Sequence, residues 1–444
     1  MNKINETEIA YRGFTTLDRL GRVFIYKEKF YRGIYPDKVE YVEELLQSGL
    51  LAELVKSGAF IETTKTAFYC DSFPLILEHK RITSSLPTDW SFSMLKDAVK
   101  TILRVNNICN KYGYKLGDAH PYNICFDRVQ PKWIDFGSIQ KDSSGIWEAR
   151  QEFTDCSIVP LAFIARNELL QGYSLLLALR AFKLYSKPFR DTLLYKSFIE
   201  MIATGTEPFN EDTADGKWID SFCATYDNDT SYWGNYQENA ASIEKNLHEH
   251  AENRFQRFFK IPHLVKKYAS DAKTALDLAG NSGQASFIFS QTCKFNKIIN
   301  VDYDSLAIEE SYRFLKNHPS INAETYLLNF MLPVQQDSIE NFRSDLVFAL
   351  AVTHHLLLTQ GYKIDGIFEQ IKLYSNKYVF IEFMPLGLWG GDPTNKPEIP
   401  DWYTLEWFKI NFQKHFTLLG VEVLEEHTIN DRKEAHRVLF IGKI

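Results

Sequence analysis

The stretch at residues 274–304, TALDLAGNSGQASFIFSQTCKFNKIINVDYD, contains the pattern that decides the fold of the second half of the chain. An apolar run at 275–278 has the length of a buried strand. Gly280 and Gly283 follow it and predict a sharp turn into a helix. A second apolar run at 298–301 predicts another strand. The order strand, turn, helix, strand is typical of an α/β domain with a parallel sheet.

This arrangement also indicates a ligand site. A glycine-bearing turn brings backbone N–H groups and a helix N-terminus close to a ligand. Asp302 ends the second strand, where a carboxylate can accept hydrogen bonds from two ribose hydroxyls. The longer glycine fingerprint of dinucleotide-binding domains is absent. A ligand-free strand–turn–helix remains the structural alternative, because a fold does not define a function.

The stretch resembles the S-adenosylmethionine (SAM) site of class I methyltransferases, whose first motif is an acid followed by three glycines on alternate positions. Asp277 fills the position of the acid. Ala279 and Asn281 replace the first two glycines, Gly283 keeps the third, and Gly280 lies between them. The resemblance implies SAM as the cofactor, and Ala279 is a departure that narrows the space for the methionine end of the ligand.

The rest of residues 263–444 fits the same family. Short apolar runs alternate with helical segments, so we expect a Rossmann-like sheet with crossover helices. Seven strands with a final hairpin is the class I methyltransferase count. The resemblance implies further cofactor contacts at Tyr303, beside Asp302, at Asn329 after the third strand and at Ala349 at the end of the fourth. The later strands are expected at 325–328, 345–350, 378–383, 417–424 and 437–441.

Candidate catalytic residues follow the fourth and fifth strands. Methyl transfer to a hydroxyl or amine requires alignment of the nucleophile and removal of a proton. His354 and His355 follow the fourth strand and are candidate general bases, and Glu382 at the end of the fifth is another. Trp389 lies in the next loop, where it could line an acceptor pocket. The alternative is that the histidines pack or bond to the backbone.

A second motif lies in the first half of the chain. Residues 114–139 read YKLGDAHPYNICFDRVQPKWIDFGSI, with Asp118, Asn123 and Asp135 in the order of a phosphotransferase site. The motif resembles the catalytic core of the kinase superfamily, above all aminoglycoside-type phosphotransferases. The resemblance implies that Asp118 orients or deprotonates an acceptor hydroxyl, while Asn123 and Asp135 hold Mg²⁺ against the phosphates of ATP. His120 is expected to be a structural residue of this loop.

The rest of this phosphate site is left open by the sequence. The phosphate-binding lysine and its acidic partner have several candidates: Lys27 and Lys29, and Glu43, Glu44 and Glu53. Three readings of the domain therefore stand: an active kinase, a nucleotide-binding relic and a purely structural domain.

Length and composition limit the number of domains and the classes of partner that the chain can have. A chain of 444 residues with 45% apolar residues predicts two or three domains. We expect a two-lobed α+β kinase-like domain at 1–210, a linker and helical lid at 211–262 containing the aromatic cluster at 232–236, and the methyltransferase domain at 263–444. A net charge of −7 argues against a specific nucleic-acid partner. Six scattered cysteines suit reduced thiols in the cytoplasm, and no apolar run is long enough for a membrane span.

The whole pattern resembles the bacterial family of nodulation-type methyltransferases of the NoeA kind. The expected function is SAM-dependent methylation of a small-molecule or glycan acceptor, with the kinase-like domain aiding substrate binding. One alternative is a bifunctional kinase–methyltransferase that uses Mg-ATP in its first domain. Another is a non-catalytic sensor that binds SAM without turnover. The sequence leaves open the acceptor, the atom methylated and whether the protein is an oligomer.

Overall fold

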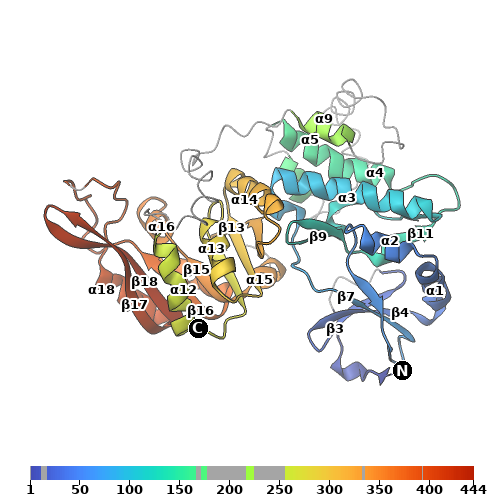
Figure 1. Ribbon diagram of the computed structural model, residues 1–444, viewed down its shortest axis with the longest axis horizontal. Helices are drawn as coiled ribbons and strands as arrows, with labels where there is room; N and C mark the ends of the chain where they lie inside the picture. The colour runs from blue at the N-terminus through green and yellow to red at the C-terminus, as the bar shows by residue number, and fades with distance from the viewer. Residues whose placement is uncertain are drawn as a thin grey trace. The chain divides into compact units, whose positions relative to one another are not determined.

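The computed structural model describes residues 2–11, 18–166, 172–177, 217–224, 256–332, 336–392 and 394–444. The chain divides into two compact units, 1–227 and 228–444, each with its own core (Figure 1). The aromatic cluster at 232–236, expected to form a lid, lies outside the described residues.

The first unit begins with a five-stranded antiparallel sheet in the order β2-β3-β4-β7-β5. Apolar residues alternate along its strands, and Phe24, Tyr31 and Phe73 pack together in the core beside it. The strands are β2 Ala10–Tyr11, β3 Gly21–Tyr26, β4 Lys29–Ile34, β7 Leu75–His79 and β5 Thr63–Lys65, with β1 Asn2–Lys3 and β6 Phe68–Tyr69 paired beside them.

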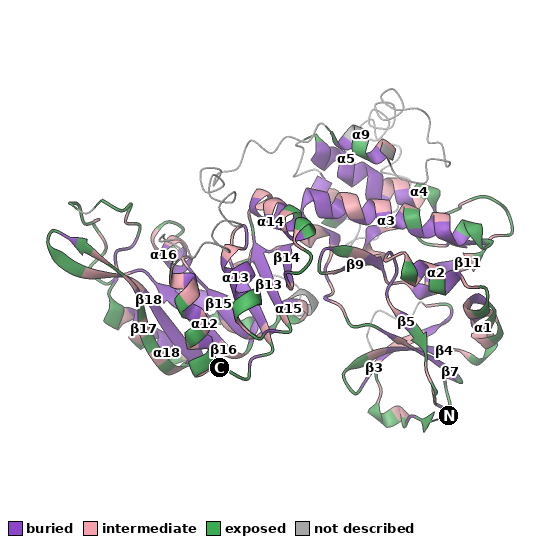
Figure 2. Ribbon diagram, viewed as in Figure 1, coloured by how far each residue is buried: buried purple, intermediate pink, exposed green. Residues whose placement is uncertain are grey.

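The rest of the first unit is built around the long helix α3, Phe92–Lys111, which buries an apolar stripe that begins at Phe92. Figure 2 shows the buried side of this helix turned toward its neighbours. Two short antiparallel pairs, β8 with β11 and β9 with β10, carry the second sequence motif. The elements are α1 Val39–Gln47, α2 Leu50–Lys56, β8 Tyr114–Leu116, β9 Ile124–Asp127, β10 Gln130–Trp133, β11 Ile139–Lys141, α4 Arg150–Phe153, α5 Val159–Ala165 and α9 Lys217–Cys223.

The second unit is an α/β domain with a seven-stranded sheet in the order β14-β13-β12-β15-β16-β18-β17. Its first five strands in sequence are parallel, and β18 runs antiparallel to β16 and β17. The expected strand number and final hairpin are therefore confirmed. The strands are β12 Thr274–Leu278, β13 Lys297–Asp302, β14 Ala323–Leu327, β15 Ser344–Ala349, β16 Ser375–Phe383, β17 Thr417–Ile429 and β18 Arg432–Lys443.

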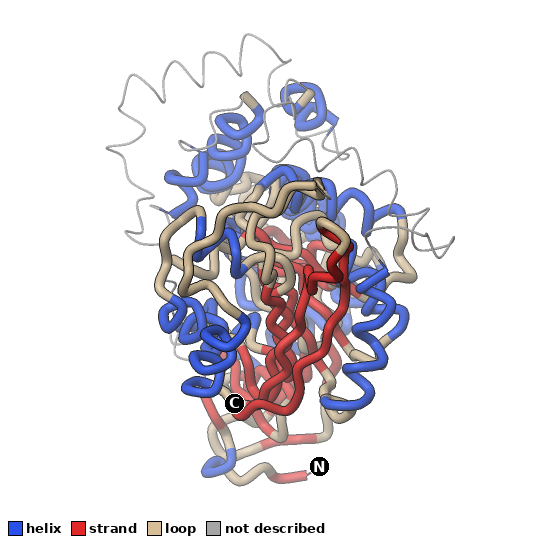
Figure 3. The backbone as a smooth tube through the Cα atoms, turned by 90° about the vertical axis from the view of Figure 1, so that its left-hand side faces the viewer, coloured by secondary structure: helices blue, strands red, loops and turns tan. Residues whose placement is uncertain are grey.

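Helices cover both faces of this sheet (Figure 3). Parallel strands need such crossovers, and their runs are apolar because both faces are buried. The helices are α12 Gln256–Tyr268, α13 Gln284–Thr292, α14 Ser305–Asn317, α15 Gln336–Phe342, α16 Thr353–Leu358, α17 Ile364–Leu373 and α18 Leu405–His415.

The structure differs from the expected domain boundaries at two places. Helix α12 runs through Pro262, where a boundary was expected, and its Arg257 lies 3.6 Å from Glu382 of β16, so the second unit begins before residue 263. Helix α9 falls in the expected linker, yet its Asp220 accepts a hydrogen bond from Lys100 of α3 at 2.7 Å and belongs to the first unit. Sequence periodicity missed both because these contacts are long-range.

Two further expectations can be compared with the structure. All six cysteines are free. Among the described residues, no helix has both the length and the apolar character needed to cross a membrane.

Candidate functional sites

The turn between β12 and α13 has the backbone of a glycine-rich loop, although Ala279 and Asn281 stand at two of the motif's glycine positions. Ala279 and Asn281 have φ values of 57° and 50°, in the left-handed region, and Gly283 has 84°. Such conformations are unfavourable for alanine and cluster at functional sites. The positions where the methyltransferase motif has glycines therefore keep a glycine-like backbone.

Gly280 is required for a different reason. A Cβ atom at this position would lie 2.1 Å from Asn300 Oδ1 and 2.7 Å from Asp277 Oδ2. The Asn300 amide in turn donates to the carbonyl of Asn281 at 2.9 Å. The middle strands therefore approach the turn too closely to admit a side chain at residue 280.

Asp302 connects the end of β13 to this turn. Its carboxylate accepts hydrogen bonds from the N–H groups of Asn281 (2.8 Å) and Asp304 (2.9 Å). The side chain is buried, and burial raises the pKa of Asp302 to about 6. A carboxylate has about four acceptor sites, so these two bonds leave acceptor capacity for a ligand. Asp302 thus lies at the carboxyl edge of the sheet, held in place by the turn.

Asp277 lies beneath the turn. It is 1% exposed, and Ser286 Oγ of α13 donates to its Oδ2 at 2.9 Å. Burial raises the pKa of Asp277 to about 7. The acid of the motif therefore fixes the start of α13 to β12, while the turn above it faces outward.

The other expected cofactor residues follow the same strand ends. Tyr303 is 51% exposed beside Asp302. Asn329 is half-buried after β14, and its amide oxygen accepts from the Met331 N–H at 3.1 Å. Ala349 is buried at the end of β15. Because β12 to β15 are parallel, these residues come to one edge of the sheet, the edge at which α/β domains bind ligands.

Glu382 is held by several partners. It is fully buried, and its Oε2 accepts from the Ala351 N–H at 2.7 Å and from Arg437 Nη1 at 3.1 Å. Arg257 Nε lies 3.6 Å from its Oε1. Ala351 itself has a left-handed backbone, with φ of 52°. Glu382 therefore anchors the turn after β15, an arrangement that favours a positioning role over proton transfer.

The two histidines differ in burial. His354 is 5% exposed, and burial lowers its pKa to about 2, which makes it a weak base at neutral pH. The neighbouring His355 ring lies 4.1 Å away and is half-buried, and its pKa is lowered by burial as well. His355 is therefore the better placed of the two to accept a proton from an acceptor. Trp389, expected at an acceptor pocket, packs against the rings of His427 and His436.

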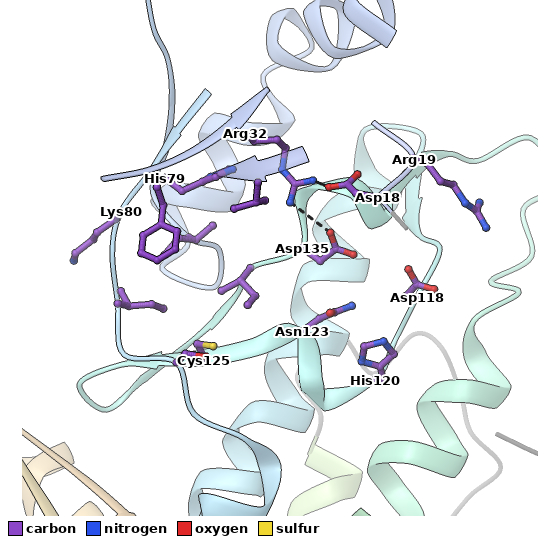
Figure 4. A pocket seen from close by; sticks show the side chains of 16 residues that line it. Asp18, Arg19, Arg32, His79, Lys80, Asp118, His120, Asn123, Cys125 and Asp135 are labelled. Carbon is purple, nitrogen blue, oxygen red and sulfur yellow. Dashed lines mark ion pairs between the residues drawn. The ribbon is translucent and has the colours of Figure 1, made fainter. Parts of the chain in front are cut away.

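In the first unit, the residues of the second motif line one pocket of about 670 Å³ (Figure 4). Asp118, Asn123 and Asp135 all contribute to its wall, as do His120 and His79. The Asp135 carboxylate accepts from the Gly137 N–H at 2.9 Å, and burial raises its pKa. Oxygen donors of this kind suit Mg²⁺, so Asn123 and Asp135 fit the role of metal ligands that the resemblance implies.

The buried cation in this pocket is Arg32 of β4, which sequence reasoning missed; the exposed Arg19 and Lys80 also line the pocket. Arg32 is 3% exposed, forms an ion pair with Asp18, and its Nη2 lies 3.7 Å from Asp135 Oδ1, as the dashed lines in Figure 4 show. The sequence contains a signal for this placement. Phe30, Arg32 and Ile34 occupy every second position of β4, so their side chains lie on one face of the strand.

The lysines and acids considered for the phosphate site lie elsewhere. Lys27 lies in the β3–β4 turn, with φ of 48°, and Lys29 binds Glu78 at 2.6 Å. The acids that were considered, Glu43, Glu44 and Glu53, do not line this pocket; Glu43 pairs with Lys65 and Glu44 with Lys141. The sequence left the choice among these residues open, and none of them lines the pocket.

Comparison with known proteins gives one related sequence and several similar structures. No protein-family model matches the chain. Nodulation protein NoeA of Rhizobium meliloti (strain 1021) is 22% identical over 413 residues, which cover 83% of each chain. Among solved structures, an S-adenosylmethionine-dependent methyltransferase from Clostridium acetobutylicum ATCC 824 is 11% identical, with a TM-score of 0.36 over 47% of this chain and 98% of that one. Magnesium protoporphyrin IX methyltransferase from Synechocystis PCC 6803 is 10% identical, with a TM-score of 0.32 over 48% and 96%.

Proposed function

We propose that the second unit binds SAM and transfers its methyl group to a small-molecule or glycan acceptor. The observation that carries this proposal is Asp302 at the end of β13, bonded to the left-handed turn that follows β12. A ribose bound at this edge can donate to the acceptor capacity that remains on Asp302. The turn offers backbone N–H groups at the start of α13 to the rest of the ligand.

The proposed reaction is an in-line displacement. Bound SAM supplies an electrophilic methyl group, and the chain aligns an acceptor hydroxyl or amine with it. We assign the acceptor side to the segment after β15, where Glu382 fixes Ala351 and His355 is half-buried. Neutral His355 accepts the acceptor proton as the bond to the methyl group forms.

The test is calorimetric titration of SAM into the intact protein and into Asp302→Ala. Charge-assisted hydrogen bonds contribute about 1.5–3 kcal/mol each, so we expect affinity to fall by about 30-fold or more. Asp271→Asn is the matched control, because Asp271 precedes β12 at the other end of the strand and pairs with Lys377. Unchanged affinity in Asp302→Ala would overturn the site, and tight SAM binding without transfer to any acceptor would favour the sensor.

A second candidate function belongs to the first unit. We propose that its pocket binds Mg-ATP, because Asp118, Asn123, Asp135 and Arg32 all line it. Asn123 and Asp135 would hold the metal ion, and Arg32 offers a positive charge to the phosphates. Since Arg32 is paired with Asp18, phosphate binding has to compete with that carboxylate. With an acceptor hydroxyl oriented by Asp118, the protein would be bifunctional.

Titration of Mg-ATP into the intact protein tests this second function. Asp135→Ala removes a metal ligand, and we expect binding to weaken by at least about tenfold. Asp71→Asn is the control, since Asp71 is exposed and pairs with Lys3 at 2.7 Å. Binding that is absent from the intact protein would make this unit a scaffold. Binding that persists in Asp135→Ala would refute the assigned metal ligands.

A further inference from the structure

The β17–β18 hairpin gathers three metal-ligating side chains that the proposed methyl transfer does not use. These are Glu425 and His427 of β17 and His436 of β18. Each offers one ligand atom, and the three atoms lie within 4.8 Å of one another. Around tetrahedral Zn²⁺, with bonds of about 2 Å, ligand atoms are about 3.3 Å apart. Small side-chain rotations would therefore bring the three ligand atoms to the distances that one bound ion requires.

The hairpin backbone explains how these residues meet. Asn430 and Asp431 form its two-residue turn, with φ of 49° and 61°, as type I′ hairpins require. Glu425 and His427 are two residues apart and share one face of β17. Glu425 pairs with Arg437 and Glu426 with Ala435, so His436 is the extra residue of a β-bulge. Bulges re-aim side chains, and this one brings His436 beside Glu425.

His436 supplies an independent reason to expect a ligand. It is 7% exposed, and neither of its ring nitrogens has a hydrogen-bond partner among the described residues. The nearest carboxylate oxygen, Glu425 Oε2, lies 3.8 Å from its Nδ1. A buried polar group without a partner is costly, by about 1–3 kcal/mol, and its presence needs an explanation. A metal ion bound to one ring nitrogen provides it.

The surroundings hold the carboxylate in place. Arg437 Nε binds Glu425 Oε2 at 2.9 Å, while Oε1 accepts from His427 Nε2 at 2.7 Å. Arg437 also forms an ion pair with Glu382, so the positive charge of Arg437 is already compensated. Glu425 is therefore held in a fixed orientation by a hydrogen-bonding neighbour, as metal-ligating carboxylates are.

We propose that Glu425, His427 and His436 bind one divalent transition-metal ion of the Zn²⁺ type. Two imidazoles and one carboxylate are ligands that Zn²⁺ accepts, and three protein ligands leave a position for water or for an oxygen of a bound substrate. The site lies against the Trp389 ring, 4.9 Å from that of His427 and 5.2 Å from that of His436. Arg437, which binds Glu425, also binds Glu382 at 3.1 Å, and Glu382 holds the turn after β15 on the proposed acceptor side.

The test is titration of Co²⁺ into the chelator-treated, full-length protein in excess Mg²⁺, which occupies oxygen-donor sites. We expect one equivalent to bind, with a visible d–d absorption band that Zn²⁺ abolishes. His427→Gln and His436→Ala are each expected to weaken binding by at least about tenfold. His427 is half-buried, so His427→Gln should fold even if His436→Ala does not.

His415→Ala is the matched control. Its ring nitrogens bond to two different carboxylates, Asp365 at 2.8 Å and Glu369 at 2.9 Å. His415 is therefore an acid-paired histidine of the same unit that lies outside the proposed ligand set. Co²⁺ binding should be unchanged in this variant. The proposal is refuted if the intact protein binds no Co²⁺, if His427→Gln binds it as tightly as the intact protein, or if His415→Ala loses it equally.

Discussion

At the scale of single residues, Asp277 occupies the acid position of the motif in an environment that is unfavourable for charge. Burial raises its pKa to about 7, against about 3.9 in the unfolded chain. The unfolded state therefore releases this proton at lower pH than the folded state does. The folded protein loses stability as pH rises from about 4 to about 7, and the full penalty is present above that window.

Asp277→Asn should remove this penalty because the amide is neutral and has the shape of the protonated acid. We expect the variant to raise the free energy of unfolding by about 2–4 kcal/mol at about pH 8 and to change it little at about pH 4. Denaturant unfolding at the two pH values measures the difference. An equal effect at both pH values would mean that folding does not raise the pKa of Asp277.

Arg32 shows what residue-level reasoning from the sequence misses. The search for a phosphate-binding lysine led to Lys27 and Lys29 because of residue type and region. In the structure, the strand alternation turns Arg32 inward, and Asp18, fourteen positions earlier, pairs with it. A buried ion pair of this kind depends on the segment before β3 meeting β4, which a single sequence does not display.

At the scale of elements, the β12–α13 turn holds alanine where glycine is favoured. Ala279 has φ of 57°, so Ala279→Gly should relieve strain and stabilise the protein by about 0.5–1 kcal/mol. Ala285→Gly, inside helix α13, should instead destabilise it by about 1 kcal/mol or more. Thermal unfolding of both variants shows whether each substitution raises or lowers the stability of the protein. Destabilisation by Ala279→Gly would contradict the left-handed backbone assigned to this turn.

Sequence patterns predicted local elements well and long-range ones poorly. The strands β12 and β13, the turn and Asp302 lie within about thirty residues, so apolar runs and glycines sufficed to place them. The cluster of Glu425, His427 and His436 was missed because a bulge in the hairpin, not spacing, brings His436 into it. The sequence does show Glu425 and His427 two residues apart, a spacing that places both side chains on one face of a strand. The boundary expected after Pro262 falls inside helix α12, because this proline does not end the helix as prolines usually do.

At the scale of the whole molecule, the chain contains two units with separate cores and separate candidate sites. Every residue assigned to the SAM site lies after residue 228, and every residue lining the Asp135 pocket lies before it. Units with their own hydrophobic cores fold alone in principle. A fragment of residues 228–444 should therefore bind SAM with an affinity within about threefold of that of the intact protein.

Expression of the two fragments, 1–227 and 228–444, tests this independence. Calorimetric titration of SAM into the second fragment gives the affinity, and thermal scans of the intact protein should show two transitions that match those of the fragments. A folded second fragment that binds SAM much more weakly than the intact protein would show that the first unit contributes to the site. The first unit would then act by completing the proposed SAM site, and the search for its role would move from Mg-ATP to the SAM-bound state.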